Sequence, residues 1–330
     1  MMLSLGPFQG ITDAPFRNVF KKHFGGIDKY YTPFFTGIQK EHAKNLQVEE
    51  IDPAVNDVET LTPQILSTDA DEILRFAFQC KELGYKEINL NMGCPFPRVA
   101  NKKRGCGLLP YPEKIDALLD GVFQKIDIGF SIKCRLGYFS PDEIVPVIGV
   151  FNRYPLSELV IHPRIGKQLY KGEADVHRFA ELMPLVKAPL VYNGDIVSVE
   201  RFERIREQVQ PVNAFMLGRG VLANPFLAEE IKAQVAGIAP GAPFGPTSAD
   251  VRDPERLHAY VVDLYEDRLR HAGGSPKVLG RMKELWSYLM YSFDAPQDIW
   301  RKINKINALK EYEEAVEAVF REQGLVRSEE

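Results

Sequence analysis

"PLVYNGDIVSVERFERIREQVQPVNAFMLGRG", residues 189–220, contains one complete strand–helix–strand unit. Two short apolar runs, Pro189–Tyr192 and Ala214–Leu217, flank Val199–Gln208, whose apolar residues recur with helical spacing. Each apolar run ends in a turn that contains glycine. Because parallel neighbours in a sheet need a long crossover, usually a helix, the unit predicts two parallel strands with their ends on the same side.

The same pattern recurs through the preceding part of the chain. The further strand-like runs are Leu3–Pro7, Lys29–Phe34, Thr62–Leu66, Glu87–Asn91, Gly129–Cys134 and Glu158–His162. The further amphipathic stretches are Ala70–Leu83, Pro112–Ile126, Asp142–Phe151 and Asp175–Val186. Strands that alternate with helices in this way predict an α/β fold of the (β/α)8 TIM-barrel type. An open doubly wound sheet is the next choice, but no GxGxxG follows the first strand.

The composition changes after residue 236. GIAPGAPFGP, residues 237–246, is rich in glycine and proline, which is typical of a linker. Beyond it the pattern is helical, with apolar stripes such as Leu279, Met282, Leu285, Trp286 and Leu289. The sequence therefore predicts a catalytic barrel at residues 1–236, a linker at 237–253 and a small helical bundle at 254–330.

Charge and cysteine content exclude several classes of protein. The 330 residues carry a net charge of −4, so the chain as a whole is not a basic nucleic-acid binder, although local basic clusters can still bind. Four cysteines form neither a disulfide framework nor a zinc-finger spacing. No apolar stretch is long enough to cross a membrane. We expect a cytoplasmic protein with reduced thiols, no metal site, no membrane contact and no obligate protein partner.

The predicted strand ends carry many polar side chains, which is where a TIM barrel places its active site. They are Pro7, Gln64, Asn91, Cys94, Lys133, Arg135, His162, Arg164, Asn193, Asp195, Gly218 and Arg219. The last two strand ends supply Asn193, Asp195, Gly218 and Arg219. Glycine there lets backbone N–H groups approach an anion, so these ends predict a phosphate pocket.

Lys133 lies inside the apolar run GFSIKCRLG, where a buried amine is costly without a partner. One hypothesis is an internal ion pair; the other is contact with an electron-rich ring such as a reduced flavin. Gln64 has the donor and acceptor that suit the edge of such a ring. His162 is ambiguous, since a histidine at a strand end is more often structural.

"NLNMGCPFPRVANKKRGCGLL", Asn89–Leu109, places two thiols, glycines and a basic run after one strand. Glycine is common where a strand ends and the chain turns, so the glycines need no further explanation. Turn chemistry leaves Cys94 and the basic residues that follow it unexplained.

The motifs resemble those of the tRNA-dihydrouridine synthases in order and spacing. They are GPFQGITDAPFR (Gly6–Arg17), NLNMGCPFP, SIKCRLG, IHPRIGKQLYKG, YNGDI and LGRG. The resemblance implies FMN as cofactor and NADPH or NADH as reductant. It also implies a hydride delivered to C6 of uracil and a proton given to C5 by Cys94, since a thiol of ordinary pKa is protonated at neutral pH. Cys106, which lies beyond the basic run in a glycine loop, is the less favoured candidate for this acid. Pro7, Gln64, Lys133 and His162 would hold the flavin, with its phosphate at the last two strand ends.

The resemblance further implies tRNA as the partner, with a base extruded into the barrel. The predicted substrate and tRNA contacts are Asn91, Arg98, Lys102, Arg135, Arg164, Lys167, Arg281 and Lys283. RMKELWSYLMYSF, Arg281–Phe293, is most similar to the C-type subgroup, which the resemblance associates with position 16 of the D-loop. Two alternatives stay open: an FMN ene-reductase or dihydroorotate-type dehydrogenase acting on a small molecule, and an RNA-binding chaperone without turnover.

Overall fold

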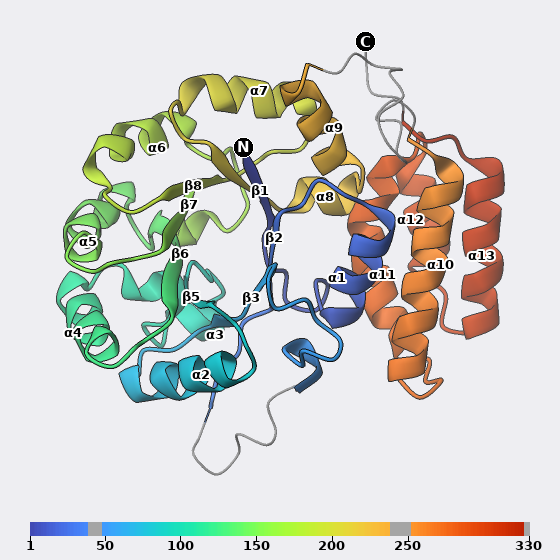
Figure 1. The fold of residues 1–330 in the computed structure, drawn as a ribbon. Coiled ribbons are helices and arrows are strands. Elements are labelled where there is room, and N and C mark those ends of the chain that lie inside the picture. Colours follow the sequence, from blue (N-terminus) through green and yellow to red (C-terminus); the bar gives the residue numbers. More distant parts are fainter. Residues whose placement is uncertain (39–47, 238–251, 327–330) are drawn as a thin grey trace. The chain divides into compact units, whose positions relative to one another are not determined.

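The computed structural model describes residues 1–38, 48–237 and 252–326, which fall into two compact units. The first unit contains Met1–Pro7, Asp28–Asp195 and Glu203–Leu217. The second contains Phe8–Ile27, Ile196–Phe202 and Gly218–Glu330. Figure 1 labels their helices and strands, and all the sheet strands belong to the first unit.

The first unit is built on a closed parallel barrel. Its strands are β1 (Met2–Leu5), β2 (Lys29–Tyr31), β3 (Leu61–Thr62), β4 (Gln64–Ile65), β5 (Glu87–Met92), β6 (Gly129–Gly137), β7 (Glu158–Ile165), β8 (Leu190–Asn193) and β9 (Ala214–Leu217). They pair in the order β3-β2-β1-β9-β8-β7-β6-β5-β4, all parallel. Only Pro63, which has no N–H to donate, separates β3 from β4, so the two ends of this order are one interrupted strand. The predicted TIM barrel is confirmed.

Helices surround the strands of this unit (Figure 1). They are α2 (Ala70–Glu82), α3 (Pro97–Ala100), α4 (Pro112–Phe123), α5 (Ile144–Phe151), α6 (Val176–Leu182) and the part of α7 (Val199–Gln208) from Glu203 onward. Asp69 caps α2, accepting from the backbone N of Asp71 at 2.9 Å. The helix predicted at Asp142–Phe151 is shorter, because Pro141–Glu143 form a 3₁₀ turn and α5 begins at Ile144. Pro146 therefore lies in the first turn of α5, where a backbone N–H would have no acceptor within the helix, so its absence breaks no helical hydrogen bond.

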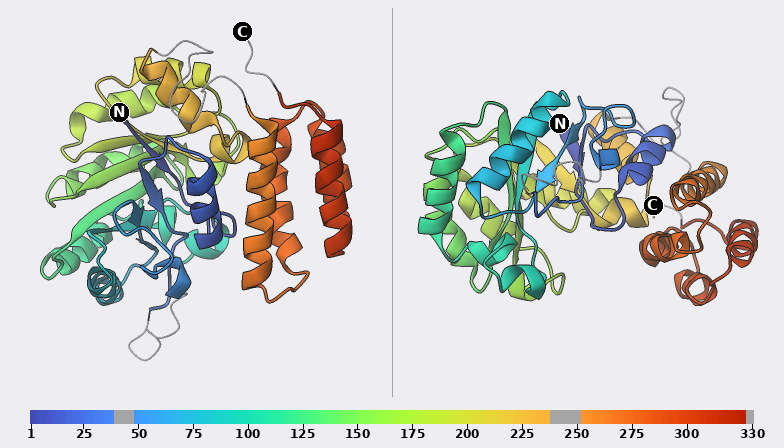
Figure 2. Two further views of the ribbon diagram at one scale, coloured as in Figure 1. Left: turned by 45° about the vertical axis from the view of Figure 1, so that its right-hand side comes forward. Right: turned by 90° about the horizontal axis from the view of Figure 1, so that it is seen from below.

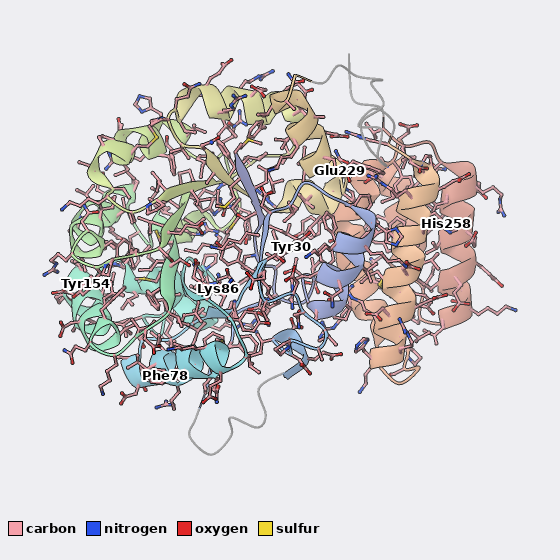
Figure 3. The ribbon with its side chains drawn as sticks, viewed as in Figure 1. Tyr30, Phe78, Lys86, Tyr154, Glu229 and His258 are labelled. Carbon is pink, nitrogen blue, oxygen red and sulfur yellow. The ribbon has the colours of Figure 1, made fainter. Side chains whose placement is uncertain are left out.

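The barrel interior has an apolar part and a polar part. Tyr31, Val160, Val191 and Met216 form a buried cluster within it. This cluster gives the barrel a packed core rather than an open channel, and Figure 3 draws the side chains over the same ribbon. Alternate residues of a strand face opposite sides, and in this barrel polar side chains occupy the inner face of β5 and β6.

The second unit contributes no strand to the sheet, and its described part consists mainly of helices. They are α1 (Ala14–His23), α8 (Arg219–Ala223), α9 (Leu227–Val235), α10 (Pro254–His271), α11 (Val278–Leu289), α12 (Pro296–Ile303) and α13 (Leu309–Glu322). The right-hand view of Figure 2 looks along the helices α10 to α13 of the bundle. Trp286 is buried in it and donates from Nε1 to the Tyr312 hydroxyl at 2.9 Å. The predicted linker, residues 237–253, lies almost wholly outside the described residues, so the predicted domain boundary stays a prediction.

Two searches of residues 1–38, 48–237 and 252–326 set limits on function. No helix there is both long enough and apolar enough for a membrane crossing. Nor do three His, Cys, Asp or Glu side chains gather there as ligands for a metal ion.

Candidate active site

The carboxyl ends of the strands bring the predicted polar residues together on the inner face of the barrel. In the register of β5 and β6, Asn91 lies opposite Lys133. In the register of β6 and β7, Arg135 lies opposite His162. Gln64, on β4, is fully buried next to β5. Because alternate residues share a face, Lys133 and Arg135 point to the same side as each other.

Asn91 holds the loop that carries Cys94. Its Oδ1 accepts from the backbone N of Gly93 and of Cys94, each at 3.0 Å. Its Nδ2 donates to Oε1 of Gln64 at 2.7 Å. These bonds tie the loop to the strand end and give Asn91 a positioning task. Its direct contact with substrate stays a prediction.

The Cys94 thiol is buried and protonated at neutral pH. Only 8% of the residue is exposed, and this burial raises the pKa of the thiol. A backbone hydrogen bond from Phe96 and the charges of Arg135 and Arg98 act in the opposite direction but do not reverse the shift. A thiol in this state can donate a proton to a neighbouring carbanion.

Cys106 contacts the backbone of the Cys94 loop. Its backbone N and its Sγ lie 3.2 and 3.3 Å from the Cys94 carbonyl oxygen. Burial raises the pKa of the Cys106 thiol to about 12. Gly105 has a φ of +55°, and a Cβ there would stand 2.6 Å from the same carbonyl, so glycine is required. Cys106 thus contacts the backbone of the Cys94 loop, and the assignment of the acid to Cys94 stays a prediction.

Lys133 has no carboxylate partner among the residues that the structure describes. Its amine is surrounded by protein, and this desolvation, with the charge of Arg135, lowers its pKa to about 8. The alternative of an internal ion pair is therefore not supported within the described ranges. An amine of this kind is available to an anionic or electron-rich ligand.

Arg135 is buried and donates hydrogen bonds to backbone carbonyls of two separate segments. It is 2% exposed and donates to the carbonyls of Gly93 at 3.1 Å, Ile165 at 3.0 Å and Leu169 at 2.7 Å. Its guanidinium also lies 5.3 Å from the ring centroid of Tyr170. The side chain thus joins the Cys94 loop to the end of β7. Its predicted contact with tRNA stays a prediction, and the geometry favours a positioning role.

Arg164 and Asp195 form a buried bidentate ion pair. The guanidinium nitrogens lie 2.9 and 2.6 Å from the two carboxylate oxygens. Arg164 Nη1 also lies 3.0 Å from Nε2 of His162. Since arginine can only donate, Nε2 accepts, which leaves the proton on Nδ1 in a neutral ring. Arg164 is 1% exposed, so the predicted tRNA contact would need a substrate that reaches inside the barrel.

The predicted phosphate residues are described separately in each unit. In the first, Asn193 Nδ2 donates to the Met216 carbonyl at 2.8 Å, and Pro7 is half-buried just after β1. In the second, Gly218 precedes α8 and no side chain caps that helix. At Gly220 a Cβ would stand 2.1 Å from the Ile196 carbonyl, so the turn admits no side chain. The assignment of Asn193, Asp195, Gly218 and Arg219 to a phosphate stays a prediction.

Exposed basic and aromatic side chains share the loops after β5, β6 and β7. Arg98 and Lys102 are exposed after β5. Lys167 lies 5.0 and 5.4 Å from the ring centroids of Tyr138 and Phe139. Phe139 is 59% exposed. Phe139 does not stand out in the sequence, because it lies among residues typical of turns.

The basic residues predicted on the helical unit have protein partners. Arg281 donates from Nη1 to Oδ2 of the buried Asp13 at 2.5 Å, and Arg268 donates to Oδ1 at 2.9 Å. Lys283 lies 3.3 Å from Oδ1 of Asn307. About half of the Arg281 side chain is exposed, so part of it can meet a ligand while the ion pair holds.

Sequence comparison assigns the chain to a family. A sequence model described as dihydrouridine synthase (Dus) matches residues 4–323. The chain belongs to this family. The dihydrouridine synthase match spans all six motifs, including Cys94, Lys133 and the basic loops.

Named relatives within the family cover most of the chain. The tRNA-dihydrouridine(16) synthase of Neisseria meningitidis serogroup B is 25% identical over 325 residues, 94% of each chain. Its counterpart in Pseudomonas syringae pv. tomato is 31% identical over 244 residues, 72% of this chain and 76% of that one. The tRNA-dihydrouridine synthase B of Salmonella typhimurium is 28% identical over 329 residues, 96% of this chain and 95% of that one.

Two inner residues of this dihydrouridine synthase were missed by sequence reasoning. Asn89 and Ser131 are fully buried and bonded to each other at 2.8 Å. The signal was present in Glu87, Asn89 and Asn91, which alternate with apolar residues and so share one face of β5. Only the barrel decides that this polar face points inward.

Proposed function

We propose that this chain is an FMN-dependent tRNA-dihydrouridine synthase. It reduces the C5=C6 bond of a D-loop uridine with electrons from NADPH or NADH. One observation carries the proposal: the protonated thiol of Cys94 follows β5, and the amine of Lys133 lies on the neighbouring strand β6 with no carboxylate partner among the described residues, in a chain of this family.

The side chains fit a flavin. The Lys133 amine supplies positive charge, which a ring that carries negative charge after reduction favours. Gln64 is fully buried, and its amide retains one N–H beyond its bond to Asn89. When bound, reduced FMN supplies the hydride that C6 of a uracil ring accepts.

The protein's own part in the reaction is a proton held on Sγ of Cys94. Burial keeps that proton in place at neutral pH, and the carbon C5 of the reduced uracil receives it. Asn91 and Arg135 hold the loop through backbone atoms of Gly93 and Cys94, so the thiol is aimed without their touching sulfur.

The substrate is proposed to be tRNA because basic and aromatic groups ring the strand ends. Arg98, Lys102 and Lys167 are suited to phosphates, and the open face of Phe139 is suited to an unpaired base. A small-molecule reductase has no need of these groups. We propose uridine 16 as the target, supported by two relatives that carry that name and by the segment Arg281–Phe293.

Two measurements test the proposal. The chromophore released from the denatured protein should be FMN, and the purified enzyme with NADPH should convert one uridine of unmodified tRNA to dihydrouridine, located by mass spectrometry of nuclease fragments. A protein that binds no FMN contradicts the flavin assignment. Dihydrouridine at another position contradicts only the choice of uridine 16.

A further inference from the structure

A chain of side-chain hydrogen bonds crosses the barrel interior below the proposed flavin site. Asn91 Nδ2 donates to Gln64 Oε1 at 2.7 Å, and Gln64 Nε2 donates to Asn89 Oδ1 at 2.8 Å. Asn89 Nδ2 then donates to the Ser131 hydroxyl at 2.8 Å, which donates to Glu87 Oε1 at 2.5 Å. Gln64, Asn89 and Ser131 are each 0% exposed. The chain is therefore unbroken and shielded from water at its centre.

The donors and acceptors of this chain admit one direction only. At the upper end, Asn91 Oδ1 must accept because its partners are the backbone N–H groups of Gly93 and Cys94. At the lower end, the Glu87 carboxylate can only accept. Every amide between these ends is thus fixed in orientation, with each donor pointing toward Glu87.

Charged groups at the start of the strands secure the lower end. Lys29 Nζ lies 2.9 Å from Glu87 Oε1 and 3.5 Å from Glu158 Oε1. The Tyr31 hydroxyl donates to Glu158. Burial holds the pKa of Tyr31 well above its usual value, so the hydroxyl stays a donor. The Glu87 end of the chain is thereby held in place by its ion pair with Lys29.

Packing alone does not require such a chain. The same barrel fills another part of its interior with Tyr31, Val160, Val191 and Met216. A buried polar side chain costs free energy unless its bonds are complete, and here three neutral polar side chains are placed in succession. Two of them, Asn89 and Ser131, lie between Glu87 and Gln64, the residue assigned to the flavin edge.

We infer that Asn89 and Ser131 are positioning residues that set which atoms of the Gln64 amide face the flavin ring. The inference rests on the proposed function, since it needs a flavin against Gln64. With its Oε1 bonded to Asn91 and one N–H to Asn89, Gln64 presents its remaining N–H and its second oxygen lone pair in one fixed arrangement. Through Asn91 the same chain also holds the backbone of the Cys94 loop.

The test compares Ser131→Ala with Ser4→Ala in the full-length apoprotein. Ser4 is a matched control: it is a serine of β1, 1% exposed, whose hydroxyl lies 3.5 Å from the Phe215 carbonyl and takes no part in the chain. FMN and riboflavin are titrated by flavin fluorescence, and the absorption spectrum of bound FMN is recorded. Unfolding temperatures are measured for both variants.

Ser131→Ala is expected to lower the affinity for FMN and for riboflavin by the same factor, roughly 2- to 12-fold, which corresponds to one net hydrogen bond. An equal loss of affinity for FMN and riboflavin would locate the effect at the flavin ring, because riboflavin has the ring but no phosphate. The visible spectrum of bound FMN should shift, and Ser131→Thr, which keeps a hydroxyl, should restore wild-type values. Ser4→Ala should change neither affinity nor spectrum.

Asn89→Ala breaks the same chain from the other side and replaces Ser131→Ala if that variant does not fold. Wild-type affinity and spectrum in the folded variant, with only a lowered unfolding temperature, overturn the inference and leave the proposed function standing. A wild-type protein that binds neither FMN nor riboflavin overturns both.

Discussion

Replacing Cys94 by alanine should remove the proton donor and leave the rest of the site in place. The loop is held through backbone atoms, since Asn91 accepts from the Cys94 N–H and Cys106 bonds to the Cys94 carbonyl. Alanine retains both of these groups. We therefore expect the variant to fold, to bind FMN and to be reduced by NADPH at the wild-type rate.

The loss should appear only when tRNA reoxidises the flavin. A positioned general acid contributes about 10²- to 10⁴-fold in rate, so that is the expected fall for Cys94→Ala. Cys106→Ala loses one weak bond from Sγ to the Cys94 carbonyl and keeps the backbone N–H on the same oxygen. One net hydrogen bond corresponds to roughly 2- to 12-fold, which bounds the effect of this control.

The assay is anaerobic stopped-flow oxidation of the pre-reduced enzyme by unmodified tRNA, followed at the flavin absorbance. In the wild type the acid is active while protonated. Because burial raises the pKa of Cys94, the rate should stay level through neutral pH and fall only as pH rises through that raised value. Rapid oxidation of Cys94→Ala beside slow oxidation of Cys106→Ala would refute the assignment of the acid.

Three further predictions follow from the site and its rim. The pKa of Lys133 is about 8 in the folded protein and 10.5 ordinarily, so between these pH values the unfolded chain binds more protons than the folded chain. The free energy of unfolding of the apoprotein, measured with urea, should therefore rise with pH across this range. It should rise less in Lys133→Met. Arg164→Ala removes the guanidinium from the largely buried Asp195 carboxylate, which still accepts from the Ala174 N–H, and should cost about 3–5 kcal/mol of unfolding free energy. Lys167→Ala, at an exposed position, should cost under about 0.5 kcal/mol. Phe139→Ala should weaken tRNA binding by about 5- to 150-fold if one base stacks there, measured by filter binding with unchanged FMN affinity as the control.

Periodicity and motif spacing were sufficient to predict the barrel and the residues at its mouth. Apolar runs followed by helical stretches are local properties of the chain, so the strands and the TIM-barrel class could be predicted without coordinates. Cys94 and Lys133 stood out for a local reason too, because a thiol after a strand and an amine within an apolar run are unusual residues in those places.

Only the tertiary structure decided which hydrogen-bond partners the polar residues of the site have. In the sequence, Arg164 and Arg135 were predicted to contact the substrate. In the fold, Arg164 donates to Asp195, and Arg135 donates to three backbone carbonyls. Asn89 and Ser131 looked like ordinary strand residues, yet barrel closure puts them in contact across 42 positions of the chain. A hydrogen bond between distant segments depends on register and on which face turns inward, and neither is encoded by any short stretch of sequence.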